Sequence, residues 1–555
     1  MSSASLSCVG GYINKGFAQK GNLALASKRA LPLLDKVSLP LLVLFLAVFV
    51  YGMYGFDGVL PLDYSIYLYS GQRMAEGVPP YVSIFDHKGP LSPMIAGLGV
   101  MLSKLLDGDD IYTVRAVFFA TGCLTVVAVY LLGKSVFRSQ VAGFFAALTF
   151  LGFYAYGYPA ASGPEPKTPM VLFQTLSLLL ASQKRWFWAG CFGSLAFLVW
   201  QPMGVFSMMV FVLAVTRPKG ERRDAALRAL GGIVMPLLVI VGYFYYYGAL
   251  GELLDGVVLF NALYLTRGDY TTTPLVYMVV SDPTLSQTLL DPSLLWESVS
   301  GVVLPYITML GPIVIGLAMI IRLYFLKPYQ YRFAPILLSL PAPFLWAFID
   351  FALSEDFFVY LPYAAIGFGA FAASMIQRTK TPWLVGILLG MLLLGIAIAN
   401  TFEEVNAPAA NKLLATNISL SEQREGASRI EEKFGKDIRI ASVNSPQVLA
   451  LLHRENPNPY LFITAGIDRY IDAKEPGGFE GWLKGLETSD VISFFGEGQA
   501  LLPGDEASTE HREELLGWLV SYYHIEKIGP WYVFVKDSLD NPDPSQKVTL
   551  REVRQ

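Results

Sequence analysis

The sequence predicts a polytopic α-helical membrane protein of about 11 transmembrane helices, with interfacial helices in the first external loop and a C-terminal extracytoplasmic α/β domain. Of the 555 residues, 54% are hydrophobic and 15% are charged, and the mean hydropathy is +0.46. A soluble protein has about 25% charged residues. Apolar runs of spanning length recur up to residue 400, whereas residues 401–555 carry 25 acidic and 16 basic residues.

The break in charge after Asn400 divides the chain into three parts. We expect a cytoplasmic N-terminal segment at 1–37, a transmembrane domain at 38–400 and an extracytoplasmic domain at 401–555. The first apolar run is long enough to span and is followed by no A-x-A cleavage site, so we expect it to remain as an anchor.

Eleven spans of mostly apolar residues are expected, since about 20 such residues cross a bilayer. They lie near 38–56, 111–133, 140–159, 168–183, 186–201, 203–216, 229–248, 299–323, 333–352, 357–376 and 382–400.

The segment 91–106 decides the topology. If it spans, the basic loops fall on both sides of the membrane; if it lies along the interface, every basic cluster falls on one side. The positive-inside rule favours the second solution. It makes 91–106 an interfacial helix within the first external loop and fixes the external segments, which are 57–110, 160–167, the turn near 201–202, 249–298, 353–356 and everything after 400.

Cysteines and histidines give no sign of a metal site. Cys8, Cys123 and Cys191 are far apart, and the four histidines have no metal-binding spacing. We therefore expect no cofactor, with a divalent cation left open, and no nucleic-acid partner.

Two acidic residues stand out on the external side. Asp63 follows the first span by a few residues, and Glu165 lies in the next external loop. Two carboxylates at a membrane interface are suited to acid–base work on a hydroxyl. Alternatively, each is a solvated or helix-capping side chain in a loop.

Cations accompany these acids on the external side. Lys88 is a compact cation suited to a phosphate oxygen, with His87 beside it; the alternative is a lysine that extends along the interface. Arg115 begins the second span, and a lone arginine there needs an anionic partner. Lys167 either contacts substrate or pairs with Glu165, and Arg267 is a further candidate phosphate contact.

The order of these motifs resembles the GT-C superfamily of polyprenyl-phosphate-sugar glycosyltransferases, in its protein mannosyltransferase and aminoarabinose transferase branch. It is also similar to archaeal dolichyl-phosphate-mannose mannosyltransferases. The resemblance covers about residues 38–400. Its motifs are Asp63, Gly77-Val-Pro-Pro-Tyr81, His87-Lys-Gly-Pro-Leu91, Arg115, Glu165 and Tyr360-Leu-Pro362.

The resemblance implies an inverting transfer of mannose from dolichyl (polyprenyl) phosphate, held in the outer leaflet, to an extracytoplasmic glycan or protein acceptor, as in surface-layer (S-layer) N-glycosylation. Asp63 would be the general base and Glu165 would position the acceptor or the sugar. The phosphate would be bound by Lys88, then His87, Arg115 and Arg267, with Lys167 and Tyr360 also among the substrate contacts.

Three departures from the family pattern leave the acceptor type and metal use open: Tyr64 where the family has Glu, Glu165 where it often has Asp, and Gly89 where it has Pro. The rival hypothesis is a transporter or flippase of lipid-linked sugars. A transporter favours inverted repeats and charges at the midplane, and neither pattern is present in the sequence.

The C-terminal domain alternates strand and helix patterns. It offers acceptor binding or a structural cap as alternatives. Strands are expected at 437–443, 460–463, 490–495 and 531–535, and helices at 446–453, 479–486 and 512–523.

Overall fold

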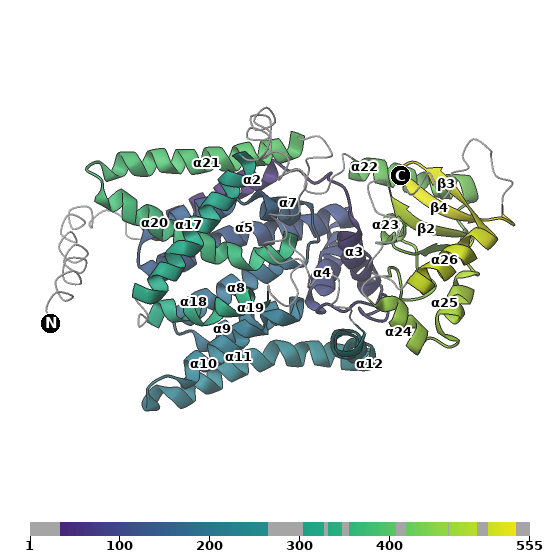
Figure 1. Ribbon diagram of the computed structural model, residues 1–555, viewed down its shortest axis with the longest axis horizontal. Coiled ribbons are helices and arrows are strands. Elements are labelled where there is room, and N and C mark those ends of the chain that lie inside the picture. The colour runs from purple at the N-terminus through teal and green to yellow at the C-terminus, as the bar shows by residue number, and fades with distance from the viewer. Residues whose placement is uncertain are drawn as a thin grey trace.

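The computed structural model describes residues 34–264, 304–326, 331–346, 354–406, 418–463, 466–496 and 509–539. The residues up to 406 form a helical body, and those from 418 form an α/β domain at one end of it (Figure 1).

Each of the eleven expected spans coincides with one helix of this body or with two consecutive ones. The helices are α2 (Leu34–Gly52), α5 (Asp110–Phe137), α6 (Gln140–Leu151), α7 (Tyr154–Ser162), α8 (Lys167–Ser182), α9 (Trp186–Val199), α10 (Gly204–Val215), α11 (Lys219–Tyr246), α17 (Leu304–Leu326), α18 (Ala334–Ser339), α19 (Pro341–Trp346), α20 (Leu361–Arg378) and α21 (Pro382–Asn406).

Not every one of these helices is long enough to cross a bilayer unaided. Within the described ranges, four helical stretches are long and apolar enough, and the pair α6 and α7, bent by 68°, counts as a fifth if it is one span. The four are Asp110–Phe137, Lys219–Tyr246, Phe357–Arg378 and Pro382–Asn406. The number eleven therefore stays a prediction.

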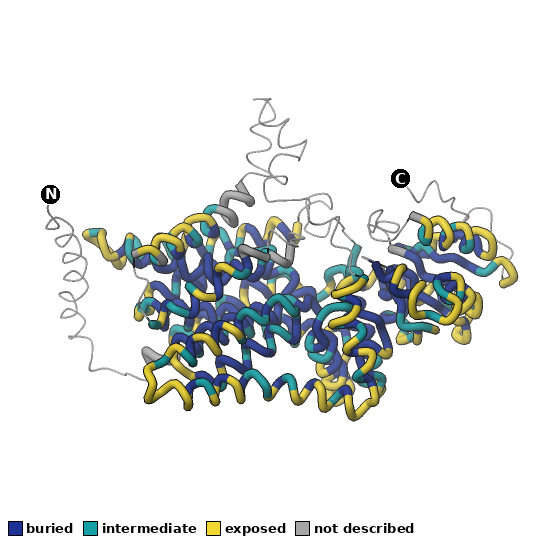
Figure 2. Tube along the Cα trace, turned by 60° about the horizontal axis from the view of Figure 1, so that its bottom comes forward, coloured by how far each residue is buried: buried dark blue, intermediate teal, exposed yellow. Residues whose placement is uncertain are grey.

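Burial separates inner from outer helices. The apolar stretch of α20 is 78% buried, whereas those of α11 and α21 are 28% and 11% buried. Figure 2 shows dark blue through the interior of the body and yellow along its outer helices. Outer helices that expose residues such as Leu238, Trp383 and Met391 are suited to contact with lipid, where exposed apolar side chains cost nothing.

The basic loops gather at the end of the body opposite the α/β domain. Lys184 and Arg217 both lie over the ring of Tyr331, at 4.9 and 4.8 Å from its centroid. Arg332 donates to the Ser135 carbonyl at 3.2 Å. Four loops that the sequence placed on one side of the membrane thus meet in space. Their assignment to the cytoplasm stays a prediction.

The segment 57–110, which the sequence predicts to be the first external loop, contains two helices, α3 (Leu62–Ala75) and α4 (Leu91–Leu106). The expected interfacial helix at 91–106 is confirmed as a helix, with the same bounds. The two pack closely, because a Cβ on Gly71 would lie 2.7 Å from the Gly97 nitrogen. Asp109 caps the next helix by accepting the Tyr112 N–H at 2.9 Å.

Short elements in segments that the sequence predicts to be external are η1 (Gln201–Met203), α12 (Leu250–Leu254), the π-helical turn η2 (Asp255–Phe260), α13 (Asn261–Leu263) and η5 (Ser354–Tyr360); η4 (Tyr331–Phe333) lies at the basic end. π-helical turns are rare overall, and those that occur are often at functional sites. The turn η2 is therefore relevant to the candidate site.

The C-terminal domain is a four-stranded sheet of order β1-β2-β4-β3 with five helices. The parallel pair β1–β2 joins Ile440 to Val491, and β2–β4 and β3–β4 are antiparallel. Its elements are α22 (Leu420–Phe434), β1 (Ile440–Ser442), α23 (Pro446–Leu452), α24 (Ile467–Lys474), α25 (Gly478–Leu486), β2 (Val491–Gly496), α26 (Thr509–Tyr522), β3 (Tyr523–Ile528) and β4 (Trp531–Lys536).

Two sequence expectations for this domain were wrong. Residues 460–463 are buried but form no strand, because their backbone bonds side chains: the Ile463 N–H donates to Asn444 Oδ1 at 2.6 Å. The sequence also missed β3, where Glu526 is fully buried and paired with Lys433 at 2.7 Å. A buried charge conceals the alternation that marks a strand.

The domain shares one hydrophobic core with α3 and the start of α5, in which Leu68 and Val114 join Leu449 and Trp531. Polar contacts also cross the contact surface. Gln423 bonds both backbone groups of Leu60, at 2.7 and 3.1 Å, and the Asn456 N–H donates to the Tyr69 hydroxyl at 3.0 Å. The expected boundary at 400/401 lies inside α21, which continues to Asn406.

Candidate active site

The loop between α3 and α4 brings the ammonium group of Lys88 close to the carboxylate of Asp63. The Nζ atom of Lys88 lies 3.7 Å from Oδ2 of Asp63, in the first turn of α3. The Asp63 side chain is 57% exposed and that of Lys88 is 28% exposed. An exposed carboxylate beside a half-buried ammonium is available to solutes that reach this end of the body.

Lys88 is held in its charged form by its surroundings. Burial by itself lowers the pKa of the ammonium, but the surrounding phenol and carboxylates outweigh burial and raise that pKa well above the ordinary value. These groups are Tyr67, Asp63, Asp86 and Glu165. Because burial raises the pKa of the Tyr67 phenol, this ring is neutral at ordinary pH, and the carboxylates supply the attraction.

His87 is held as a neutral ring. Burial lowers its pKa, with nearby Asp86 opposing the shift. Nδ1 lies 3.9 Å from the Asp86 carboxylate, and the ring packs at 5.6 Å from that of Phe260. Asp86 itself accepts the N–H groups of His87 and Lys88, at 2.7 and 3.1 Å, and so closes the turn that presents Lys88.

Glu165 approaches the same loop from a second external segment. Its side chain is only 3% exposed, and Oε1 accepts the Lys167 N–H at 3.0 Å. The Ser92 hydroxyl at the start of α4 reaches the Pro166 carbonyl at 3.5 Å. The Lys167 ammonium lies 5.0 Å from the ring centroid of Trp200. Glu165 and Lys167 therefore belong to the surroundings of the Lys88 loop.

Gly89 explains one departure from the family pattern. Its N–H donates to the Val199 carbonyl at 3.2 Å, a bond that proline cannot make. A Cβ built on it would lie 2.0 Å from the Leu198 oxygen. The loop passes so close to the end of α9 that a residue with a side chain forces the backbone to move.

Replacing Gly89 with Ala should lower the activity of the protein roughly tenfold, since small displacements of a binding group are costly. Turnover and thermal unfolding of purified protein provide the measurement. Gly251→Ala is the matched control, since a Cβ there meets nothing within 4 Å. Equal turnover of the Gly89 and Gly251 variants would show that the close approach is unimportant.

Three other candidates have different positions. The Arg115 guanidinium is fully buried and donates to the carbonyls of Phe56 and, at 3.1 Å, Val59. Arg115 thus has the loop that leads to α3 as its partner in place of the expected lipid phosphate. The Tyr360 hydroxyl donates to the Pro343 carbonyl at 2.5 Å. Arg267 lies outside the described residues.

Two amides that the sequence analysis did not single out reach the loop. Gln201 and Asn261 each donate a side-chain N–H to the His87 carbonyl, both at 2.8 Å. The only signal in the sequence is a lone amide next to apolar residues, in two loops that the topology placed on one side. That signal does not reveal that side chains from both loops donate to the same carbonyl oxygen.

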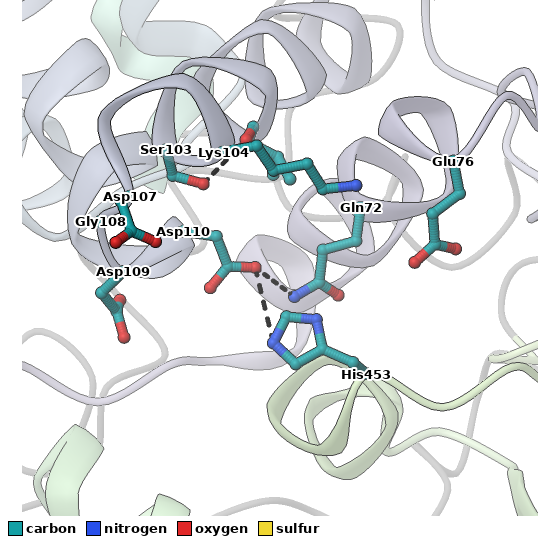
Figure 3. Close-up of a pocket in the computed structure, with 10 residues that line it drawn as sticks. Gln72, Glu76, Ser103, Lys104, Asp107, Gly108, Asp109, Asp110 and His453 are labelled. Atoms are coloured by element: carbon teal, nitrogen blue, oxygen red, sulfur yellow. Dashed lines mark hydrogen bonds and ion pairs between the residues drawn. The ribbon is translucent and has the colours of Figure 1, made fainter.

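A separate pocket of about 320 Å³ lies at the other end of α3 (Figure 3). Gln72, Lys104 and Asp110 line it together with His453 of the C-terminal domain, and Gln72 bonds Asp110 at 2.7 Å. None of the expected site residues lines this pocket. Among the described residues, no group of three or more His, Cys, Asp or Glu side chains is arranged to hold a metal ion.

Comparison with solved structures identifies the fold. ArnT from Cupriavidus metallidurans bound to undecaprenyl phosphate aligns with a TM-score of 0.54, over 92% of this chain and 100% of that chain, at 13% identity. The apo state of ArnT gives a TM-score of 0.50 at 14% identity, with the same coverage. The Archaeoglobus fulgidus oligosaccharyltransferase AglB, in complex with an inhibitory peptide and a dolichol-phosphate, gives a lower score of 0.46 at 13% identity, over 92% and 76% of the two chains.

The chain shares the fold of ArnT, as the resemblance of its motifs to the aminoarabinose transferase branch led us to expect. Within it, residues 87–246 match the family model of dolichyl-phosphate-mannose-protein mannosyltransferases. The match begins at His87, the residue that opens the loop described above. No curated protein sequence matches the chain.

Proposed function

We propose that the protein is an inverting glycosyltransferase that moves mannose from dolichyl (or another polyprenyl) phosphate to an extracytoplasmic glycan or protein acceptor, in N-glycosylation of a surface-layer protein. The observation that carries the proposal is the 3.7 Å pair of Lys88 and Asp63. It lies in a chain with the fold of ArnT, which has been solved with undecaprenyl phosphate bound. The match to the mannosyltransferase family model, which begins at His87, supports mannose as the transferred sugar.

Lys88 and Asp63 have complementary parts in such a transfer. The acceptor hydroxyl loses its proton to the Asp63 carboxylate as its oxygen attacks the anomeric carbon. The bond from that carbon to the phosphate oxygen breaks, and its electron pair stays on the polyprenyl phosphate. The departing phosphate gains negative charge, which the Lys88 ammonium stabilises at close range. Attack opposite to the leaving group inverts the anomeric carbon.

Glu165 is suited to a different task from Asp63. It is almost fully buried and accepts a backbone N–H, so it lies within the wall of the site. We assign it the positioning of the sugar or the acceptor hydroxyl through its second oxygen. In this proposal the donor comes from the outer leaflet, so the α3–α4 end of the body faces outward, together with the C-terminal domain, and the N-terminus is cytoplasmic.

The test is transfer by the purified full chain, reconstituted with synthetic polyprenyl-phosphate mannose, glucose or aminoarabinose and a panel of glycan and glycopeptide acceptors. The expected result is release of polyprenyl phosphate and a mannosylated product whose anomeric configuration, measured by NMR, is opposite to that of the donor. A retained configuration would contradict the mechanism. Movement of the lipid-linked sugar between leaflets without transfer would favour the transporter hypothesis.

A further inference from the structure

The backbone around Lys88 is fixed at each polar group from His87 nitrogen to Gly89 nitrogen. The N–H groups of His87 and Lys88 bond the Asp86 carboxylate. The Lys88 carbonyl accepts the Tyr81 hydroxyl at 2.6 Å, and Gly89 bonds Val199. The two peptide planes that flank the Lys88 Cα are therefore both held, which sets the direction of its Cβ.

The His87 carbonyl is the most heavily bonded of these groups. It accepts Gln201 Nε2 and Asn261 Nδ2, both at 2.8 Å, from loops 114 and 174 residues away. A carbonyl oxygen has two lone pairs, and here both have donors. Because this carbonyl belongs to the peptide that precedes Lys88, the two amides control the plane from which the lysine side chain departs.

Asn261 connects this peptide to the segment after α11. Its amide also donates to the carbonyls of Val257 at 2.9 Å and Gly256 at 3.3 Å, within the π-helical turn η2. A Cβ on Gly256 would lie 2.5 Å from the backbone carbonyl oxygen of Asp86. The turn η2 thus lies directly against the loop.

We propose that Asn261 and Gln201 are positioning residues, which hold the Lys88 ammonium where it binds the phosphate of the lipid donor. This inference rests on the proposed function, since it assigns a role within the same site. Without the two amides, the 87–88 peptide keeps only the bond from the Lys88 N–H to Asp86, and the ammonium is drawn toward whichever of the surrounding carboxylates is nearest. A binding group must be held within about 0.5 Å of its productive position.

The test compares binding of undecaprenyl phosphate with binding of undecaprenol by the purified full chain. The phosphate preference, which is the ratio of the two affinities, reports on Lys88 alone, whereas a loss of fold weakens both ligands. Asn261→Ser and Gln201→Met should each lower this ratio about three- to tenfold, as expected for one of two bonds to a single acceptor. The double variant should lower it by more than the product of the two single effects, because the two bonds share one acceptor.

Asn406→Ser is the matched control. The Asn406 amide bonds the carbonyl four residues earlier, Phe402, at 2.7 Å, as Asn261 bonds Val257. Within the described part of the chain it forms no hydrogen bond to the Lys88 loop. Its phosphate preference should equal that of the wild type. Serine at 261 can still bond the carbonyl four residues earlier, so the loss specifically reports the bond to His87.

The outcomes separate the two proposals. If the wild type shows no preference for phosphate over alcohol, the proposed function and the positioning role both fall. If the wild type shows the preference and Lys88→Met removes it, while the double variant retains it, only the positioning role is overturned. Equal weakening of both ligands in the double variant, with a lowered melting temperature, also overturns it and makes the amides merely structural.

Discussion

Asp63→Asn should reduce sugar transfer by about two to four orders of magnitude, the usual contribution of a positioned general base. The amide has the shape of the carboxylate but cannot accept the acceptor's proton. The Asp63 side chain is 57% exposed, and an exposed ion pair contributes little to stability. The variant should therefore fold, insert in the membrane and bind undecaprenyl phosphate as the wild type does.

Turnover and donor affinity, measured on the same preparation, check this prediction, with Asp107→Asn as the control. Asp107 is an exposed carboxylate at the same end of the body, at the C-cap of α4. Its φ of 52° is left-handed, a conformation that asparagine tolerates well. Near-normal turnover in the Asp63 variant would remove it as the base and with it the proposed mechanism.

The arrangement of the helices was predictable because it depends on quantities that a sequence contains. Span length and the placement of basic residues predicted an interfacial helix at 91–106. The structure confirms a helix there, α4 (Leu91–Leu106), and its place at the interface stays a prediction. The basic clusters around Lys184 and Arg217 do meet, over Tyr331. Membrane insertion acts on local hydropathy and charge, so local patterns are sufficient here.

The contacts of the site were only partly predictable. Asp63 and Lys88 are each close to a recognisable motif, and the structure brings them within 3.7 Å. Arg115 shows the limit: a lone arginine needs an acceptor, but nothing in the sequence says that backbone carbonyls supply it. Gln201 and Asn261 converge on one atom from distant loops, and such a tertiary contact has no periodic signal.

The C-terminal domain shows the same limit in another form. The pattern of 460–463 correctly indicated burial, but burial alone does not reveal whether a neighbouring strand or an Asn444 side chain satisfies the backbone. In β3 the inward position of Glu526 follows from its pairing with Lys433, 93 residues away. Pairwise compensation of a buried charge is invisible to a window of a few residues.

Lys88→Met should reduce kcat/KM for transfer by about two to three orders of magnitude, comparable to the loss of a principal donor to a developing anion. Methionine retains the length of the side chain without its charge. Lys88→Arg should recover only part of the activity, because the fixed backbone directs a planar fork into the space of a compact ammonium. The effect should appear in the donor KM as well as in kcat, since the phosphate is charged before and after transfer.

The pH dependence gives a second measurement of Lys88. Because Tyr67 and the neighbouring carboxylates outweigh burial and raise its pKa well above the ordinary value, the wild type should show no loss of donor binding from Lys88 deprotonation up to about pH 10. Lys104→Met is the control: Lys104 lies in the last turn of α4 and donates to the Ala75 carbonyl at 3.3 Å. If both methionine variants retain wild-type kcat/KM, another cation neutralises the leaving phosphate, and the site must be sought outside the α3–α4 loop.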